Sequence, residues 1–225
     1  MAGHTVSSVF CDRIYFNPMS VSARYFGLTG GIASGKSTVA AMLRELGAYI
    51  VDADKVGHEM LLSTSPAFAE LVAAFGRRIL DSAGRIDRSK LGSLVFADPA
   101  KLQQLNRIVH PRIIERIGQM AAEHCKQNPR AVVVVDAALI YETGIPGRFV
   151  KTMVAWCRPE QQVERLIEKT GLSREEAEKR IASQMPADEK RRRADFVIDC
   201  SGSLEETRRQ VEALYPVLKQ LALSE

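Results

Sequence analysis

Residues 26–40 read FGLTGGIASGKSTVA, and this stretch gives the strongest indication of the fold. It contains the pattern G-x-x-x-x-G-K-S, which begins at Gly30 and ends at Ser37. An apolar segment that predicts a strand (25–28) precedes the pattern, and a segment that predicts a helix (37–46) follows it. A strand, a glycine-rich turn and a helix in this order are typical of a phosphate-binding loop. The stretch therefore predicts a site for the phosphates of a nucleoside triphosphate.

The residue types within the pattern suit that chemistry. Gly30 and Gly35 let backbone N–H groups converge on an anion, and the positive end of the following helix favours negative charge. Lys36 adds a point charge for the terminal phosphates, and the Ser37 hydroxyl is a candidate ligand for Mg²⁺. An ordinary glycine-rich turn is the alternative interpretation, but the strand before it and the helix after it argue against that.

The composition of the chain is that of a globular protein, with 46% hydrophobic and 26% charged residues. A length of 225 residues predicts one domain, or one domain with inserted lobes. No apolar run approaches the roughly 20 residues needed to cross a membrane. The four cysteines (Cys11, Cys125, Cys157 and Cys200) form no C-x-x-C pair. This argues against a zinc site or a disulfide framework and favours reduced thiols in the cytoplasm.

Two segments have a biased composition. Residues 1–22 mix Ser, Asn, Pro and scattered aromatics without periodicity, which predicts a disordered arm or a true start of translation at Met19. Residues 190–193 read KRRR, in a span (158–193) that otherwise predicts a solvated, salt-bridged helical face. This basic run is a candidate contact for an anionic ligand. A polyphosphate nucleotide accounts for it as well as nucleic acid does, and no nucleic-acid-binding motif accompanies it.

Two acidic residues follow the second predicted strand. Apolar residues 48–51 predict a short buried strand that leads into Asp52 and Asp54. Ligands gather at the carboxyl ends of strands in an open α/β sheet, and the two-residue period of a strand would place both carboxylates on one face. Such a pair suits a metal contact or a base for an incoming hydroxyl group. An N-cap of the next helix is the alternative for Asp54.

The rest of the chain alternates between helical and strand patterns. Residues 55–127 predict a helical insertion, in which the His110–Pro111 pair is most simply interpreted as a helix boundary. Five apolar residues then lead into Asp136, as in a buried parallel strand with a carboxylate at its end. Two more strands (150–156 and 194–202) and two helix-opening capping boxes (173–176 and 203–206) follow. This alternation predicts an α/β fold, a three-layer doubly wound parallel sheet.

Taken together, these motifs resemble those of the dephospho-coenzyme A kinase family. They are the phosphate loop, D-A-D at 52–54, H-P at 110–111, D-A-A-L-I-Y-E at 136–142 and L-S-R-E-E-A-E-K-R-I-A-S-Q-M-P at 172–186. The resemblance implies transfer of the ATP γ-phosphate to the ribose 3′-hydroxyl of dephospho-CoA. It also implies a single kinase domain (23–225) with a helical CoA-binding lobe (57–128) and a helical lid (158–193).

The resemblance further implies roles for individual residues. Asp54 matches the family's proposed base, Lys36 is the second catalytic residue, and Ser37 and Asp52 are the candidate Mg²⁺ ligands. The implied nucleotide-binding residues are Gly30, Gly31, Ala33, Ser34, Gly35, Lys36, Ser37 and Thr38. The implied acceptor-site residues are Asp52, Arg88, His110, Leu139 and Glu142.

Some positions depart from the family pattern. Ala33 stands where many members have glycine, which predicts a negative φ that alanine adopts easily. Ala138 replaces a usual proline, and Cys200 replaces a common asparagine near the adenine end. Lys169 and Thr170 stand where Arg-Asp is frequent in the lid. A lysine cannot make the forked contact of an arginine with phosphate, so the identity of the lid cation stays open.

Two alternative functions remain open at this point. The first is another small-molecule or nucleoside kinase, which the segments 110–111 and 136–142 argue against. The second is a nucleotide switch or a non-catalytic ATP-binding module, although the N/T-K-x-D motif of a GTPase does not occur. The predicted partners are ATP and dephospho-CoA, without nucleic acid or membrane, and the predicted state is a monomer or a weak homo-oligomer.

Overall fold

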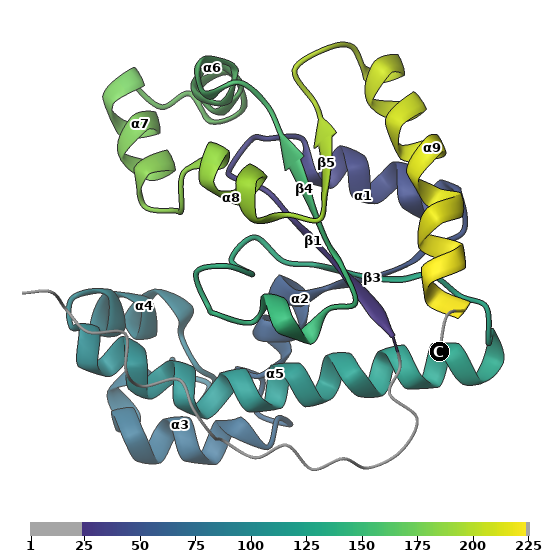
Figure 1. Ribbon diagram of the computed structural model, residues 1–225. Coiled ribbons are helices and arrows are strands. Elements are labelled where there is room, and N and C mark those ends of the chain that lie inside the picture. The colour runs from purple at the N-terminus through teal and green to yellow at the C-terminus, as the bar shows by residue number, and fades with distance from the viewer. Residues whose placement is uncertain (1–23, 224–225) are drawn as a thin grey trace, which may run out of the picture.

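Five strands form one parallel sheet in the computed structural model, which describes residues 24–223 (Figure 1). The strands are β1 (Tyr25–Thr29), β2 (Tyr49–Asp52), β3 (Val133–Asp136), β4 (Thr152–Trp156) and β5 (Phe196–Asp199). Their order is β2-β3-β1-β4-β5, and each adjacent pair is parallel. The predicted doubly wound parallel sheet is therefore confirmed. The predicted arm (1–22), with Cys11 and the alternative start at Met19, lies outside the described residues.

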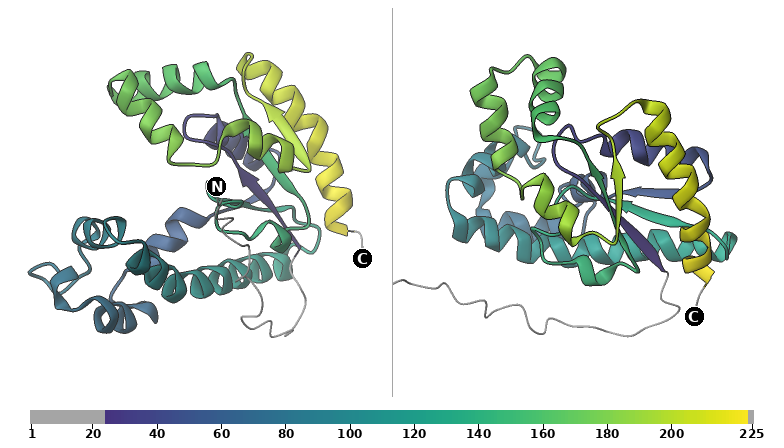
Figure 2. Two further views of the ribbon diagram at one scale, coloured as in Figure 1. Left: turned by 60° about the vertical axis from the view of Figure 1, so that its left-hand side comes forward. Right: turned by 45° about the horizontal axis from the view of Figure 1, so that its top comes forward.

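Helices cover both faces of this sheet. On one face α1 (Lys36–Glu45) packs against α9 (Leu204–Leu223), and the other face carries α2 (Ala53–Glu59) and α5 (Pro99–Gln127). Figure 2 shows α3 (Ala67–Phe75) and α4 (Arg88–Phe96) on the half of α5 that extends away from the sheet. The chain between β4 and β5 forms α6 (Pro159–Thr170), α7 (Arg174–Ala182) and α8 (Ala187–Arg193). Two short 3-10 helices, η1 (Arg77–Ile79) and η2 (Pro146–Arg148), complete the described elements.

The β3 strand shows how the layers share their cores. Val134 and Val132, the residue directly before β3, belong to the core under α1 and α9. Val133 and Val135 belong to the core under α2 and α5. All four side chains are at most 1% exposed. Because successive side chains of a strand point to opposite faces, a strand covered on both faces is apolar at every position. The prediction of a buried parallel strand from this run of valines is therefore confirmed.

Side-chain caps define several helix ends, and the two predicted capping boxes are among them. The Asp98 carboxylate accepts from the N–H groups of Ala100 and Lys101, directly before the proline at the first position of α5. The capping box at Ser173 is present, and Ser203 makes the same reciprocal pair of bonds with Glu206 at the start of α9. None of the helices within residues 24–223 is long and apolar enough to span a membrane.

The prediction of a helix boundary at His110–Pro111 is wrong. Pro111 lies inside α5, which has 29 residues. Proline removes one backbone hydrogen bond from a helix, a loss that packing can offset. Ile108 and Val109 before the proline and Ile117 after it are buried in the core that α5 shares with α2, α3 and α4. The helix therefore continues through Pro111 because these buried side chains hold it on both sides. An expectation based on the proline alone does not take such tertiary contacts into account.

The sheet-facing side of α1 provides a test of this core. Leu43 is fully buried between α1 and the sheet. Leu43→Ala is expected to lower the free energy of unfolding by about 2–5 kcal/mol, because it removes buried methyl groups and leaves a cavity. Urea unfolding of the purified protein measures this change. The matched control is Leu62→Ala, at a leucine that is 56% exposed, with an expected change within about 0.5 kcal/mol. Equal effects of the two substitutions on the free energy of unfolding would contradict the placement of Leu43 in the core.

Candidate active site

The glycine-rich turn between β1 and α1 has the backbone shape of a phosphate loop. A Cβ on Gly30 would lie 2.7 Å from the backbone oxygen of Ala155 in β4, so only glycine fits there. Gly35 has a φ of +101° and directly precedes α1, whose first N–H groups are free to bind an anion. The Ser34 hydroxyl is buried in this loop and has no hydrogen-bond partner within residues 24–223.

The prediction for the backbone of Ala33 is wrong. Ala33 has a φ of +60°, in the left-handed region, where residues other than glycine are uncommon. The prediction went from residue type to backbone angle, but the closure of the loop between β1 and α1 sets the angle here. Ile32 and Ala33 also pack against Val163, Leu166 and Ala177 of α6 and α7. These contacts hold the loop in a conformation that glycine would adopt with less strain.

The predicted nucleotide-binding residues all line a single cavity of about 560 Å³. These residues are Gly30, Gly31, Ala33, Ser34, Gly35, Lys36, Ser37 and Thr38. The opposite wall contains Arg165 and Lys169 of α6, Gln184, and the group Cys200, Gly202, Leu204 and Thr207 near the start of α9. Burial raises the pKa of the Cys200 thiol to about 11, so this wall presents a neutral thiol at pH 7.

Side chains from the α6–α8 segment hold the loop from outside. Gln162 of α6 donates from Nε2 to the backbone oxygen of Ile32, at 2.6 Å. Gln184, between α7 and α8, accepts from the backbone N–H of Ile32 at 3.1 Å. One residue of the loop thus receives both of its backbone hydrogen bonds from glutamines more than 120 positions away. Neither glutamine was predicted to bond to the loop, because no local pattern indicates these two contacts.

An ion pair joins the loop to the end of β3. Lys36 Nζ pairs with Asp136 Oδ1, and both side chains are about 15% exposed. The register places Asp136 next to Asp52 at the end of β2. Two carboxylates and the phosphate-loop lysine therefore meet at the carboxyl edge of the sheet. The predicted position of Asp136 at the end of a buried parallel strand is confirmed.

The structure corrects the arrangement predicted for Asp52 and Asp54. The strand ends at Asp52, and α2 begins at Ala53, so the two-residue period of a strand does not apply to Asp54. Asp52 is the N-cap of α2 and accepts from the N–H of Lys55 at 3.0 Å, a role considered for Asp54 instead. Asp54 lies in the first turn of α2, where its side chain is exposed. A carboxylate is favourable there because of the helix dipole.

The predicted acceptor residues are spread over three elements. Arg88 is the exposed first residue of α4, and His110 lies in α5, where burial lowers the pKa of its imidazole. Leu139 is 44% exposed in the turn after β3, and Glu142 follows it in the same turn. Among the residues that the structure describes, Arg88 and His110 do not line the loop cavity. These two side chains therefore lie outside the lining of the cavity that the phosphate loop forms.

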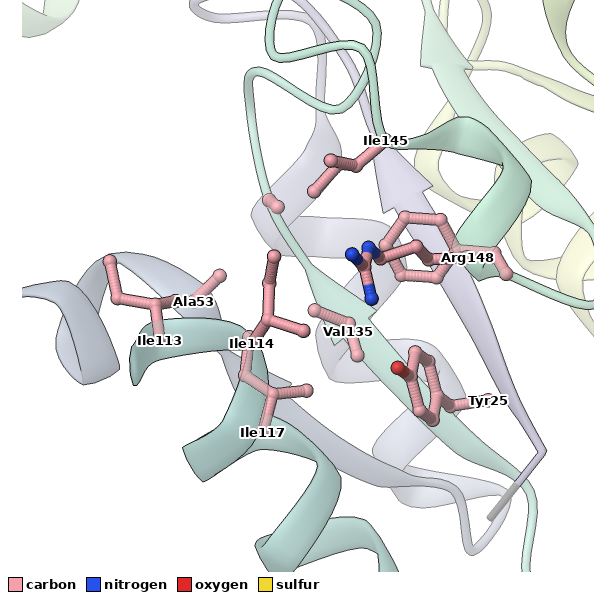
Figure 3. Close-up of a pocket in the computed structure, with 10 residues that line it drawn as sticks. Tyr25, Ala53, Ile113, Ile114, Ile117, Val135, Ile145 and Arg148 are labelled. Carbon is pink, nitrogen blue, oxygen red and sulfur yellow. The ribbon is translucent and has the colours of Figure 1, made fainter. Parts of the chain in front are cut away.

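A second, apolar cavity of about 60 Å³ lies between α5 and the sheet (Figure 3). Ile114 and Ile117 of α5 line it together with Val135 of β3, and the guanidinium of Arg148 lies among these side chains. Burial raises the pKa of the Tyr25 hydroxyl in its wall, and the charge of Arg148 partly offsets this shift. Apart from Tyr25 and Arg148 the lining is apolar, and it includes no residue of the phosphate loop.

Comparisons with known proteins identify the family of this chain. Residues 24–206 match the family model described as dephospho-CoA kinase. The chain belongs to the dephospho-CoA kinase family. A protein named dephospho-CoA kinase from Symbiobacterium thermophilum is 47% identical over 192 residues, which are 85% of this chain and 80% of that protein. Another of that name, from Geobacillus kaustophilus, is 43% identical over 194 residues, which are 86% and 94% of the two chains.

Solved structures agree with this assignment. The crystal structure of a Thermus thermophilus protein has a TM-score of 0.72 and 35% identity, and the match covers 90% of this chain and 98% of that one. A dephospho-CoA kinase from Campylobacter jejuni has a TM-score of 0.57 and 26% identity, over 88% and 98% of the two chains. This dephospho-CoA kinase family member is thus a transferase that phosphorylates dephospho-CoA, with ATP as the phosphate donor.

The Lys36–Asp136 pair supports a prediction about catalysis. Lys36→Ala is expected to lower the rate of phosphate transfer by at least about 10²-fold, because it removes a cation aimed at charge that develops during transfer. Steady-state assays with ATP and dephospho-CoA measure the loss, and circular dichroism checks the fold. Lys55→Ala removes an exposed lysine near the same edge and serves as the control. Activity of Lys36→Ala within tenfold of the unsubstituted protein would refute the role of the loop lysine.

Proposed function

We propose that the loop cavity holds ATP and that the ribose of dephospho-CoA approaches its phosphates from the side of Asp54. The observation that carries the proposal is the convergence of the phosphate loop, Lys36 and two strand-end carboxylates at one edge of the sheet. Phosphoryl transfer depends mainly on positioning and on electrostatic stabilisation of the moving phosphoryl group. The loop N–H groups and Lys36 supply both on the ATP side.

The lid cation of the proposed site is Lys169, with Arg165 in support. Lys169 is exposed, lines the loop cavity and has no ion pair among the described residues. Arg165 Nη2 donates to the backbone oxygen of Cys200 at 2.8 Å, and this bond fixes its guanidinium beside Cys200. An ammonium on a flexible stem is able to follow the phosphates as the lid closes. The lid of this proposal comprises residues 158–193, and the CoA-binding lobe comprises residues 57–128.

The donor groups near the loop suit a Mg²⁺ ion bound together with ATP. The Ser37 hydroxyl follows Lys36 at the start of α1, and the carboxylates of Asp52 and Asp136 lie at adjacent strand ends. Mg²⁺ prefers such oxygen ligands and is held by one or two protein groups along with substrate phosphates. We assign Ser37 and Asp52 as its protein contacts. When bound, the ion would neutralise charge on the phosphates.

Asp54 is the proposed base for the acceptor hydroxyl. A ribose hydroxyl is a weak nucleophile near neutral pH, so a carboxylate within hydrogen-bond reach would orient it and accept its proton. The Asp54 side chain is exposed in the first turn of α2 and makes no ion pair among the described residues. Asp52 is occupied as the cap of α2, which favours Asp54 for this role.

The remaining acceptor contacts are assigned to Arg88, His110, Leu139 and Glu142. Arg88 offers an exposed cation on the lobe for the diphosphate of dephospho-CoA. Burial keeps His110 neutral at pH 7, so its imidazole would act as a hydrogen-bonding group rather than a charge. Leu139 exposes an apolar side chain beside the end of β3. We further propose a cytoplasmic monomer or weak homo-oligomer, without nucleic acid or membrane as a partner.

An acceptor comparison tests this proposed function. ADP formation is measured with dephospho-CoA, with adenosine and with buffer alone as the acceptor. We expect turnover with dephospho-CoA to exceed both others by at least about 10²-fold, since a correctly placed acceptor gains from proximity and orientation. Adenosine carries the same ribose hydroxyl without the rest of the substrate, so it is the matched control. Equal rates with adenosine and dephospho-CoA would overturn the assignment of the acceptor.

The two carboxylates after β2 permit a sharper test. Asp54→Asn keeps the size and polarity of the side chain but accepts a proton poorly. It is expected to lower kcat by roughly 10²–10⁴-fold, the range for loss of a general base, with little change in ATP affinity. Asp52→Asn is the comparison, because it keeps a capping side chain at the start of α2. Loss of turnover in Asp52→Asn with activity retained in Asp54→Asn would show that the roles are reversed.

A further inference from the structure

A buried lysine joins the lid to the turn after β3. Lys190 of α8 is fully buried, and its Nζ donates to the backbone oxygen of Ala138 at 2.7 Å. The same Nζ lies 2.8 Å from Glu142 Oε1. The ammonium of Lys190 is thus directed into the protein, and the prediction that the basic run 190–193 faces an anionic ligand does not hold for this residue. A buried charge is costly unless it is paired and hydrogen-bonded, as it is here.

Glu142 has a second partner in the lid. Its Oε1 accepts from the backbone N–H of Met185 at 3.0 Å. The preceding residue, Gln184, accepts from the N–H of Ile32 in the phosphate loop. Two consecutive lid residues are therefore bonded to two different parts of the site. We use the term junction for this set of residues, namely Ile32, Ala138, Glu142, Gln184, Met185 and Lys190.

The junction lies between the two substrate sites. Ile32, Ala138 and Gln184 line the loop cavity, where ATP is proposed to bind. The turn that contains Leu139 and Glu142 is assigned to the dephospho-CoA side. The Ala138 oxygen also accepts from Thr29 Oγ1 at 3.0 Å, which ties this turn to the last residue of β1. A displacement of the turn on acceptor binding would move the bonded partners that hold the phosphate loop.

We propose that Lys190 and Glu142 are positioning residues that couple dephospho-CoA binding to ATP binding. This inference rests on the proposed function, since it assigns the two substrates to the two sides of the junction. In this coupling Glu142 acts through its bonds to Lys190 and Met185. Coupling between two binding sites is reciprocal, so each substrate tightens binding of the other by the same factor.

The coupling factor is measured by calorimetry. The dissociation constant of a non-hydrolysable ATP analogue is determined with and without saturating dephospho-CoA. In the unsubstituted protein we expect dephospho-CoA to tighten analogue binding by about 5-fold or more, the lower range of such couplings. In Lys190→Met, which keeps the apolar stem, the factor is expected to fall below about 2-fold. Glu142→Gln, which keeps the size of the side chain, is expected to do the same.

Two features separate positioning from a purely structural role. Loss of stability would lower the folded fraction most in the titration without dephospho-CoA, because dephospho-CoA stabilises the folded protein that binds it. A purely structural defect would therefore raise the apparent coupling factor, whereas the inference expects a lower one. The matched control is Lys179→Met, which removes an exposed ion pair with Glu175 within α7 and is expected to keep the original factor. An unchanged factor in Lys190→Met and Glu142→Gln would overturn the inference, as would failure of both variants to fold.

Binding measurements on the unsubstituted protein test the coupling separately from the proposed function. If it binds the analogue and dephospho-CoA independently, the coupling is refuted and the assigned substrates stand. If it binds the analogue but not dephospho-CoA, the proposed acceptor is wrong and the coupling is refuted with it.

Discussion

The parallel register of the sheet is the constraint on which the site depends. Because β1, β2 and β3 run in the same direction, their carboxyl ends share one edge. That edge brings together the glycine-rich turn, Asp52 and Asp136, although Lys36 and Asp136 are 100 positions apart in the chain. Each adjacent pair must match in register for Lys36 to reach Asp136. The positions of the charged side chains at this edge are thus set by the backbone hydrogen bonds that pair the apolar strands.

Predictions from sequence succeeded where a residue type has a local cause. Gly30 and Gly35 were predicted as loop glycines, because backbone approach and positive φ leave no alternative residue. Ser173 and Ser203 were predicted as caps, since their side chains accept from N–H groups three positions away. The valines of β3 predicted a strand buried on both faces. Each of these features involves only a few neighbouring residues.

The errors arose where distant parts of the chain decide the local structure. The φ of Ala33 follows from loop closure and from packing on α6 and α7. The continuation of α5 through Pro111 follows from its buried stripe. Gln162 and Gln184 carry no sequence signal for their bonds to Ile32, because those partners lie more than 120 residues away. The acceptor residues remain a prediction, because they come from separate helices and a turn and no local pattern shows which of them would lie together.

The length of α5 has a mechanical consequence. With 29 residues at about 1.5 Å each, this helix is a rod about 44 Å long. One half of α5 packs against α3 and α4, and the other half lies under the sheet (Figure 2). The helical lobe and the sheet core are therefore joined by one continuous helix. Bending stiffness is lowest where a backbone hydrogen bond is missing, and that position is Pro111. Any flexing of the lobe toward the core would therefore pivot next to His110.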